Sequence, residues 1–109
     1  MPNECSPEAF DEQLTLFEVM EKAQGSIAAS LMFPQMAEEL TDFAKTWLEK
    51  CVELGPAYRD DLDLVQKHIS QKDMAHAHML LAAVKGKQRE QMRSQFIECA
   101  KICASRERD

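Results

Sequence analysis

The residues best suited to chemistry in this 109-residue chain are four cysteines and three histidines. Cys99 and Cys103 lie four positions apart, so a helix would place both thiols on one face. His76 and His78 precede them on the same predicted helix, and a metal site is the first hypothesis for such a group. Side chains two apart on a helix point about 200° apart, so His76 and His78 cannot bind one ion from an intact helix.

A larger metal or catalytic group would need residues that are distant in sequence. Cys51 and His68 could complete a metal site only in a particular fold, which the sequence does not specify. Cys51, His68 and Asp73 could be assembled into a nucleophile, a base and an orienting acid, but most chains with a few histidines permit such a trio. Glu38 and Glu39 are adjacent and point apart around a helix. We therefore predict no catalytic residues, no metal ligands and no cofactor, and a protein that is not an enzyme.

The cysteines and the N-terminal residues also bear on the compartment. Residues 1–10 lack the basic and apolar regions of a signal peptide, and no run approaches the roughly 18 apolar residues of a membrane span. Most of the cysteines lie in apolar, helical surroundings. We expect reduced, mostly buried thiols and a cytoplasmic protein, and the sequence leaves open a redox or metal role for the thiols.

The elements that would position these residues are organised around one amphipathic stretch, Gln35 to Leu54. Its large apolar residues recur three or four apart, with acids and lysines between them. This spacing predicts an α-helix with one apolar stripe and one charged face. The stripe consists of Met36, Leu40, Phe43, Trp47, Cys51 and Leu54.

A first helix is predicted upstream, over about residues 7–24. Ser6, Pro7 and Glu8 form a good helix start, with a capping hydroxyl, a proline in the first turn and an acid near the positive end of the helix dipole. Gly25 is expected to end this helix, with Ser26 available to cap the next.

Pro34 interrupts the apolar run of residues 27–33. A proline inside a helix removes a backbone donor and clashes with the preceding turn, so a kink or a break is expected. Because Met32, Met36 and Leu40 continue one stripe, we predict a kinked helix near 26–54 rather than two helices. The sequence leaves a complete break at Pro34 open.

Three further features organise the C-terminal half. Gly55 and Pro56 are predicted to close the organising helix, with Gly55 in the left-handed cap conformation. A shorter helix is expected over roughly 57–69, followed by a new cap at 70–73 in which Asp73 replaces the usual glutamate of a capping box. A second long helix is then predicted near 71–105, with Gly86 as its weak point.

No strand-like alternation, glycine-rich loop or repeat occurs in the sequence. The fold class predicted is all-α, a single helical domain over residues 1–109. It should be an antiparallel bundle of three or four helices, with long helices near 26–54 and 71–105.

Charge is divided unevenly along the chain. Residues 1–63 hold 14 acidic and four basic residues, for a net charge of −10, and residues 64–109 hold five and nine, for +4, which together give −6. The two halves should attract each other, by folding back or across an oligomer interface. A nucleic-acid partner is disfavoured because the basic half is weak and the acidic half repels phosphate.

The apolar helix surface is the feature most informative about function. Seven methionines are present, and methionine suits surfaces that fit varying apolar partners as well as ordinary cores. The stripes exceed what one small core can easily hide, so we predict a homo-oligomer or a bound apolar partner. The residues predicted to form this binding or oligomer face are Ile27, Leu31, Met32, Met36, Leu40, Phe43 and Trp47.

The segment GSIAASLMFPQMAEELTDFAKTWLEKCVEL resembles the first long helix of phasins, with an apolar start, a Glu-Glu-Leu and then aromatic residues. The segment QKDMAHAHMLLAAVKGKQREQMRSQFIECAKICA is similar in layout to the second, and the resemblance covers roughly residues 24–105. Phasins are small bacterial helical proteins that coat polyhydroxyalkanoate granules and often self-associate. The resemblance implies a non-catalytic granule coat that uses this apolar face.

Two other classes of function fit the same surface. A helical adaptor or secretion chaperone would hold an amphipathic helix of one partner protein in a groove. A small phage or host inhibitor would block a partner surface. A coat protein should adsorb to many apolar surfaces, whereas a chaperone needs one partner at a defined stoichiometry.

Overall fold

The computed structural model describes the backbone of residues 7–108 and the side chains of residues 8–105. Within that range the chain forms four α-helices: α1 (Pro7–Met32), α2 (Ala37–Leu54), α3 (Arg59–Ser70) and α4 (Met74–Arg108). Short 3₁₀ turns, η2 (Pro34–Met36) and η3 (Pro56–Tyr58), join the first three helices. The prediction of an all-α helical bundle is confirmed.

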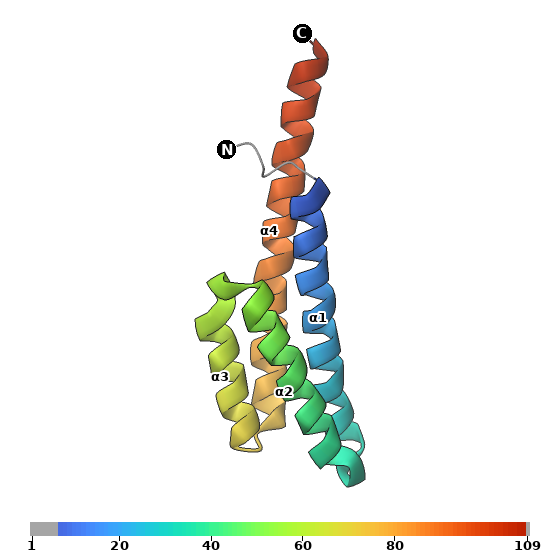
Figure 1. Cartoon of the computed structure of the whole chain (residues 1–109), viewed down its shortest axis with the longest axis vertical. Helices are drawn as coiled ribbons and strands as arrows, with labels where there is room; N and C mark the ends of the chain where they lie inside the picture. Colours follow the sequence, from blue (N-terminus) through green and yellow to red (C-terminus); the bar gives the residue numbers. More distant parts are fainter. Residues whose placement is uncertain (1–6, 109) are drawn as a thin grey trace.

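The helices alternate in direction and form an elongated bundle of 61 × 22 × 19 Å (Figure 1). α1 packs against α2 and α4, and the short α3 packs against α4 and α2. The α1–α2 and α3–α4 connections lie at the same end of the molecule, while the C-terminal part of α4 extends beyond the other helices at the opposite end. No helix among the described residues is both long enough and apolar enough to cross a bilayer.

The segment near 26–54 is two helices, so the prediction of one kinked helix there is wrong. α1 continues through Gly25 to Met32 and ends two residues before Pro34. Phe33 adopts φ −123° and ψ 75°, because a residue that precedes proline is sterically driven out of the helical region. Gly25, the expected terminator, is tolerated inside α1, and the Ser26 hydroxyl donates back to the Lys22 carbonyl (3.0 Å) instead of capping a new helix.

α2 ends at Gly55 as expected, but Gly55 is not in the left-handed cap conformation that the sequence predicts. Its φ of −129° lies outside the left-handed region. A methyl group added at Gly55 would lie 2.7 Å from Cδ2 of Leu16 and 3.3 Å from Cδ2 of Tyr58. Gly55 therefore permits close approach of the α2–α3 connection to α1.

The left-handed residue of the chain as described is Lys72, with φ 61°, in the turn before α4. Asp73 follows it and caps α4 itself, because its Oδ1 accepts a hydrogen bond from the His76 backbone N–H at 3.3 Å. The expected capping box starting at Ser70 is therefore not formed, since Asp73 occupies the cap position and not the third helical position.

The core lies where all four helices overlap. Leu48 of α2, Leu62 of α3 and Leu81 of α4 are completely buried there, together with Met20 of α1. Toward the C-terminal end of the bundle the α1–α4 contact becomes polar. Gln88 is completely buried, and its Nε2 donates to the Gln13 carbonyl at 2.9 Å.

The cysteines follow the sequence expectation in part. Cys51 and Cys103 are free thiols, the first buried and the second exposed. Cys99 is disulfide-bonded, so the expectation of reduced thiols is wrong for Cys99. Burial raises the pKa of Cys51 to about 12, which leaves this thiol protonated and unreactive at neutral pH.

Candidate apolar binding surface

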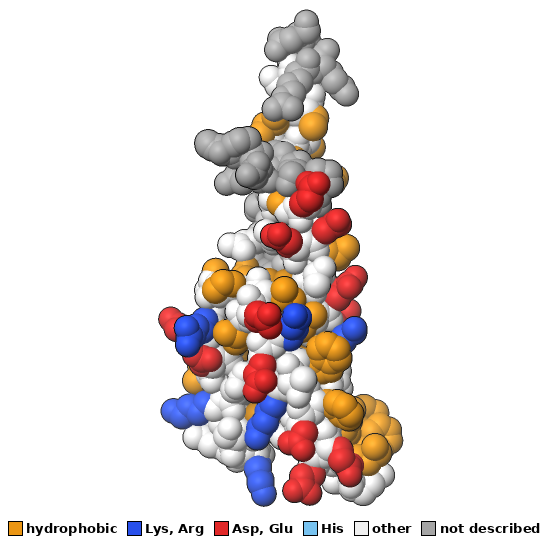
Figure 2. All heavy atoms as spheres, in the orientation of Figure 1, with side chains coloured by type: hydrophobic (Ala, Val, Ile, Leu, Met, Phe, Trp, Pro, Cys, Tyr) orange, Lys and Arg blue, Asp and Glu red, His pale blue; other side chains and the backbone are white. Residues whose placement is uncertain are grey.

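Large apolar side chains are exposed together at the end of the bundle where α1 turns into α2. We call this surface the apolar tip, and Figure 2 shows it as the hydrophobic cluster beside the α1–α2 connection. Its members and their exposed fractions are Leu31 (50%), Met32 (72%), Phe33 (47%), Met36 (47%) and Phe43 (58%).

The local structure explains why these side chains stay outside. Pro34 stops α1 and forces the chain through η2, so the residues on either side of the break form a protruding corner. In α2 the inward face is formed by Ala44, Leu48 and Cys51, all completely buried. Phe43 precedes Ala44 by one position and is thus rotated by about 100° around the helix, away from the core.

The seven residues predicted to form the apolar face lie in three different places in the structure. Leu31, Met32, Met36 and Phe43 lie on the apolar tip. Leu40 and Trp47 are partly buried on the flank of α2, and the Lys22 ammonium lies 4.8 Å from the centre of the Trp47 ring. Ile27 is completely buried in the core and contributes no surface. The structure adds Phe33 to the tip.

Acidic residues border the apolar tip. Glu38, Glu39 and Asp42 are exposed on the first turns of α2, and Figure 2 shows acidic side chains beside the hydrophobic cluster. A cleft of about 640 Å³ separates this part of α2 from the α3–α4 turn, with Pro34 and Thr41 on one wall and Ile69 and Met74 on the other. The tip is therefore a convex apolar surface with an acidic border and an adjacent cleft.

A second exposed apolar patch lies on residues 96–105, the extended part of α4. We call residues 96–105 the C-terminal arm. Phe96, Ile97 and Ile102 are its large exposed residues. Phe96 makes an edge-to-face contact with Phe10 of α1, with ring centres 6.3 Å apart. This contact is near the start of α1, and beyond it α4 extends past the other helices (Figure 1).

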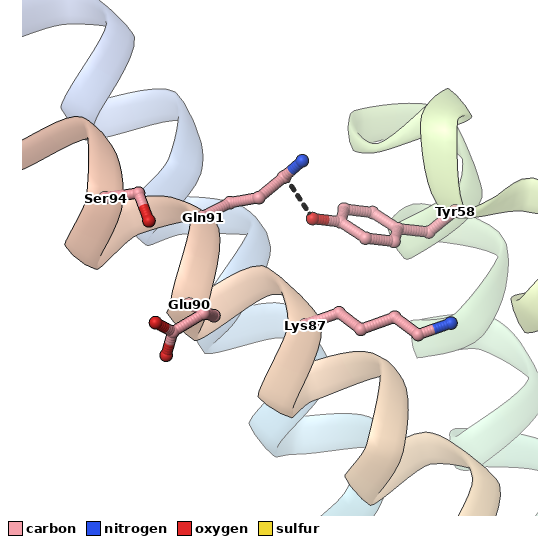
Figure 3. Close-up of a pocket in the computed structure, with 5 residues that line it drawn as sticks. All are labelled: Tyr58, Lys87, Glu90, Gln91 and Ser94. Carbon is pink, nitrogen blue, oxygen red and sulfur yellow. Dashed lines mark hydrogen bonds between the residues drawn. The ribbon is translucent and has the colours of Figure 1, made fainter.

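A shallow pocket between η3 and α4 is lined mostly by polar residues (Figure 3). The Tyr58 hydroxyl donates to Oε1 of Gln91, and burial raises the pKa of Tyr58. Lys87 reaches across to Asp61, with 3.2 Å between Nζ and Oδ2. These contacts join η3 and α3 to α4.

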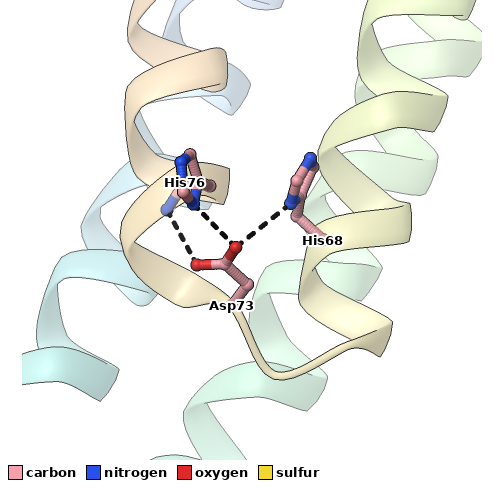
Figure 4. A network of polar contacts seen from close by, with 3 residues as sticks. All are labelled: His68, Asp73 and His76. Atoms are coloured by element: carbon pink, nitrogen blue, oxygen red, sulfur yellow. Dashed lines mark hydrogen bonds and ion pairs between the residues drawn. The ribbon is translucent and has the colours of Figure 1, made fainter.

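His68, Asp73 and His76 form a cluster at the α3–α4 turn that was not predicted from the sequence (Figure 4). The prediction concerned His76 and His78, which share a helix, whereas the fold brings His68 at the end of α3 close to the first turn of α4. The signal that could have indicated the cluster is the spacing of two histidines and an aspartate across a predicted helix–turn–helix.

Comparison with known proteins identifies no relative. No family model, curated protein or solved structure matches the chain. The resemblance to phasins therefore stays a prediction, and the case for function rests on the surfaces described above.

Proposed function

We propose that this is a non-catalytic amphipathic-helix protein that binds apolar surfaces through the apolar tip and self-associates. The observation that carries the proposal is the gathering of five large apolar side chains, each about half exposed or more, at one corner of a bundle whose core is already filled. Covering a half-exposed side chain of this size contributes about 1 kcal/mol, so five contribute ~5 kcal/mol before the costs of association.

The shape of the tip favours a broad apolar surface over a partner helix. A protein that holds an amphipathic helix needs a groove between two walls of apolar side chains. The apolar tip protrudes, and the neighbouring cleft is lined mainly by polar and small residues such as Gln35, Thr41 and Lys45. The secretion-chaperone alternative is less well supported for this reason.

The acidic border favours an uncharged apolar surface. Glu38, Glu39 and Asp42 would be repelled by anionic lipid headgroups or by nucleic acid. Against an uncharged polymer they would remain in water and repel the acidic faces of neighbouring molecules. A polyhydroxyalkanoate granule, the surface implied by the phasin resemblance, is the occupant we propose.

Self-association is assigned to the C-terminal arm. Phe96, Ile97 and Ile102 are exposed there at a distance from the apolar tip, so one molecule can use both surfaces at once. The attraction between the acidic and the basic half of the chain gives little further support for self-association, because part of it is satisfied within one molecule. Nζ of Lys85 lies 3.8 Å from Oε1 of Glu21, and Lys87 forms an ion pair with Asp61.

The experiment is adsorption of the full chain to polyhydroxyalkanoate particles and, in parallel, to polystyrene particles. The variant Met32→Ser/Phe43→Ser removes two exposed apolar side chains from the tip. We expect it to adsorb about 10- to 30-fold more weakly, since each side chain contributes about 1 kcal/mol. Light scattering on the same samples before particles are added should give a mass above that of one chain.

The matched control is Met79→Ser/Leu64→Ser, which removes two exposed apolar side chains from α4 and α3. It should adsorb within about twofold of the wild type because hydrophobic burial is local to the contact. Equal adsorption of the tip variant and the control would contradict the proposal. Failure of the wild type to adsorb to either particle would also contradict it and would favour a specific protein partner.

A further inference from the structure

The geometry points to a binding site for a divalent transition-metal ion, of which Zn²⁺ is the representative, at the α3–α4 turn. The ligands are His68, Asp73 and His76, which supply two imidazole nitrogens and one carboxylate oxygen. This donor set is one that Zn²⁺ and similar ions bind in proteins. The inference is independent of the proposed function, because none of the three residues belongs to the apolar tip or the C-terminal arm.

The three donor atoms converge on one point. Nδ1 of His76 lies 2.7 Å and Nδ1 of His68 lies 3.4 Å from the same oxygen, Oδ2 of Asp73. One ligand atom from each residue falls within 4.8 Å of the other two, and Figure 4 shows both rings directed toward the carboxylate. Metal–ligand bonds of about 2.0–2.2 Å in a tetrahedron place ligand atoms about 3.3 Å apart, so small side-chain rotations suffice.

One of the nitrogens has only a weak partner. Nδ1 of His68 is buried, and its contact is the 3.4 Å approach to Oδ2 of Asp73, which is long for a hydrogen bond. A buried imidazole nitrogen with so weak a partner is unfavourable, and coordination of a cation would use its lone pair. The centres of the two imidazole rings are 5.5 Å apart, so an ion that binds both would lie between them.

The backbone of the turn holds the ligands in place without an ion. The Asp73 N–H donates to the His68 carbonyl at 2.8 Å, which fixes these two residues beside each other. The other Asp73 oxygen, Oδ1, caps α4 through the His76 N–H, so Oδ2 is the oxygen that faces the two imidazole rings. Lys72 takes up the left-handed conformation that brings α4 back against α3. Such pre-positioning reduces the ordering cost of binding.

Three protein ligands leave at least one coordination position for water or another ligand. The site is also accessible, because His76 is largely exposed and Asp73 and His68 are partly exposed. A bound ion would join the end of α3 to the start of α4, next to the cleft that separates this turn from the apolar tip. The expected effect is therefore stabilisation of the turn, in addition to binding itself.

The test is titration of the full chain with Zn²⁺ by calorimetry, with Co²⁺ absorption as a spectroscopic probe of tetrahedral nitrogen and oxygen ligands. Cys103→Ser serves as the background, because this exposed thiol could bind Zn²⁺ on its own. We expect one ion per chain, and a thermal unfolding midpoint that rises by ~10 °C at about 100 times the dissociation constant.

The ligand variants are His68→Gln, His76→Gln and Asp73→Asn. The last keeps the helix cap, because asparagine caps as well as aspartate, but loses the anionic ligand. Each variant should weaken Zn²⁺ binding at least about tenfold. The matched control is His78→Gln, which removes the histidine two positions after His76 on α4 and should bind Zn²⁺ as the background does.

Two results would overturn the inference. One is the lack of saturable Zn²⁺ binding by the Cys103→Ser chain at concentrations up to about 1 mM, which corresponds to about 4 kcal/mol of binding free energy. The other is equal binding by the ligand variants and His78→Gln, which would place the ion elsewhere. Either result would leave adsorption to apolar particles unaffected, so it is distinguishable from failure of the proposed function.

Discussion

The three glycines of the chain should respond in opposite ways to replacement by alanine. Gly25 and Gly86 lie inside α1 and α4, and a methyl group added at either would meet no atom within 4 Å. Glycine inside a helix costs about 1 kcal/mol relative to alanine, because its backbone loses more freedom on folding. Gly25→Ala and Gly86→Ala should therefore each raise the free energy of unfolding by about 0.5–1 kcal/mol.

Gly55→Ala should have the reverse effect. Its added methyl group would lie 2.7 Å from Cδ2 of Leu16, so this side chain, which is buried in the core, would have to shift. Forcing a methyl group into a packed contact of this kind costs about 1–3 kcal/mol. The sign of this change separates the steric role of Gly55 from a role in helix capping.

Urea denaturation followed by far-ultraviolet circular dichroism measures all three variants. A change of 1 kcal/mol corresponds to about 4–8 °C in the unfolding midpoint of a domain of this size, so thermal melts provide a second measurement. If Gly55→Ala proved as stable as the wild type, the close approach to Leu16 would not be what requires glycine. If Gly86→Ala were destabilising, α4 would not be a continuous helix at that point.

Two further predictions concern buried groups. Gln88→Met should leave the free energy of unfolding, measured by urea denaturation, unchanged or raise it by up to ~2 kcal/mol. The substitution removes the hydrogen bond to Gln13, which lowers stability, but it also removes a buried Oε1 that has no hydrogen-bond partner, which raises stability. A decrease of more than about 1 kcal/mol would show that the bond to Gln13 outweighs the buried acceptor. Cys103 should react with iodoacetamide in the native protein while Cys51 should react only after unfolding, because Cys51 is buried and its pKa is raised to about 12. Equal rates of modification, measured by mass spectrometry of the native chain, would contradict the burial of Cys51.

The helical class of the fold was predictable because it depends on local periodicity. The spacing of apolar residues in α2 and the helix start at Pro7 are visible in the sequence and need no knowledge of packing. The break at Pro34 was harder, because an apolar stripe of period four continues across it. The steric restriction on the residue before proline outweighs that stripe, whereas Gly25 costs too little to end a helix.

The inward face of α2 could not be predicted from side-chain size. The large residue Phe43 is exposed, whereas the smaller residues Ala44 and Cys51 are completely buried together with Leu48. Helices approach closely where small side chains meet, so this packing leaves Phe43 on the flank. Sequence patterns give the apolar side of a helix to within about one residue of rotation, which is too coarse to separate core from surface here.

The cluster of His68, Asp73 and His76 depends on the turn between two helices. Its geometry requires the left-handed conformation of Lys72 and the hydrogen bond from the Asp73 N–H to the His68 carbonyl. Neither feature has a strong sequence signature, since lysine seldom adopts positive φ. A pattern search restricted to one helix therefore compares the wrong pair of histidines.

The elongation of the bundle has a consequence for how molecules would share a surface. The apolar tip and the end of α4 lie at opposite ends of a molecule 61 Å long and about 20 Å wide (Figure 1). Attachment at the tip alone would hold the long axis upright and give each molecule a small footprint, with the arms forming an outer layer about 60 Å from the surface. Film thickness therefore reports orientation: an upright layer is about three times as thick as one in which the helices lie flat.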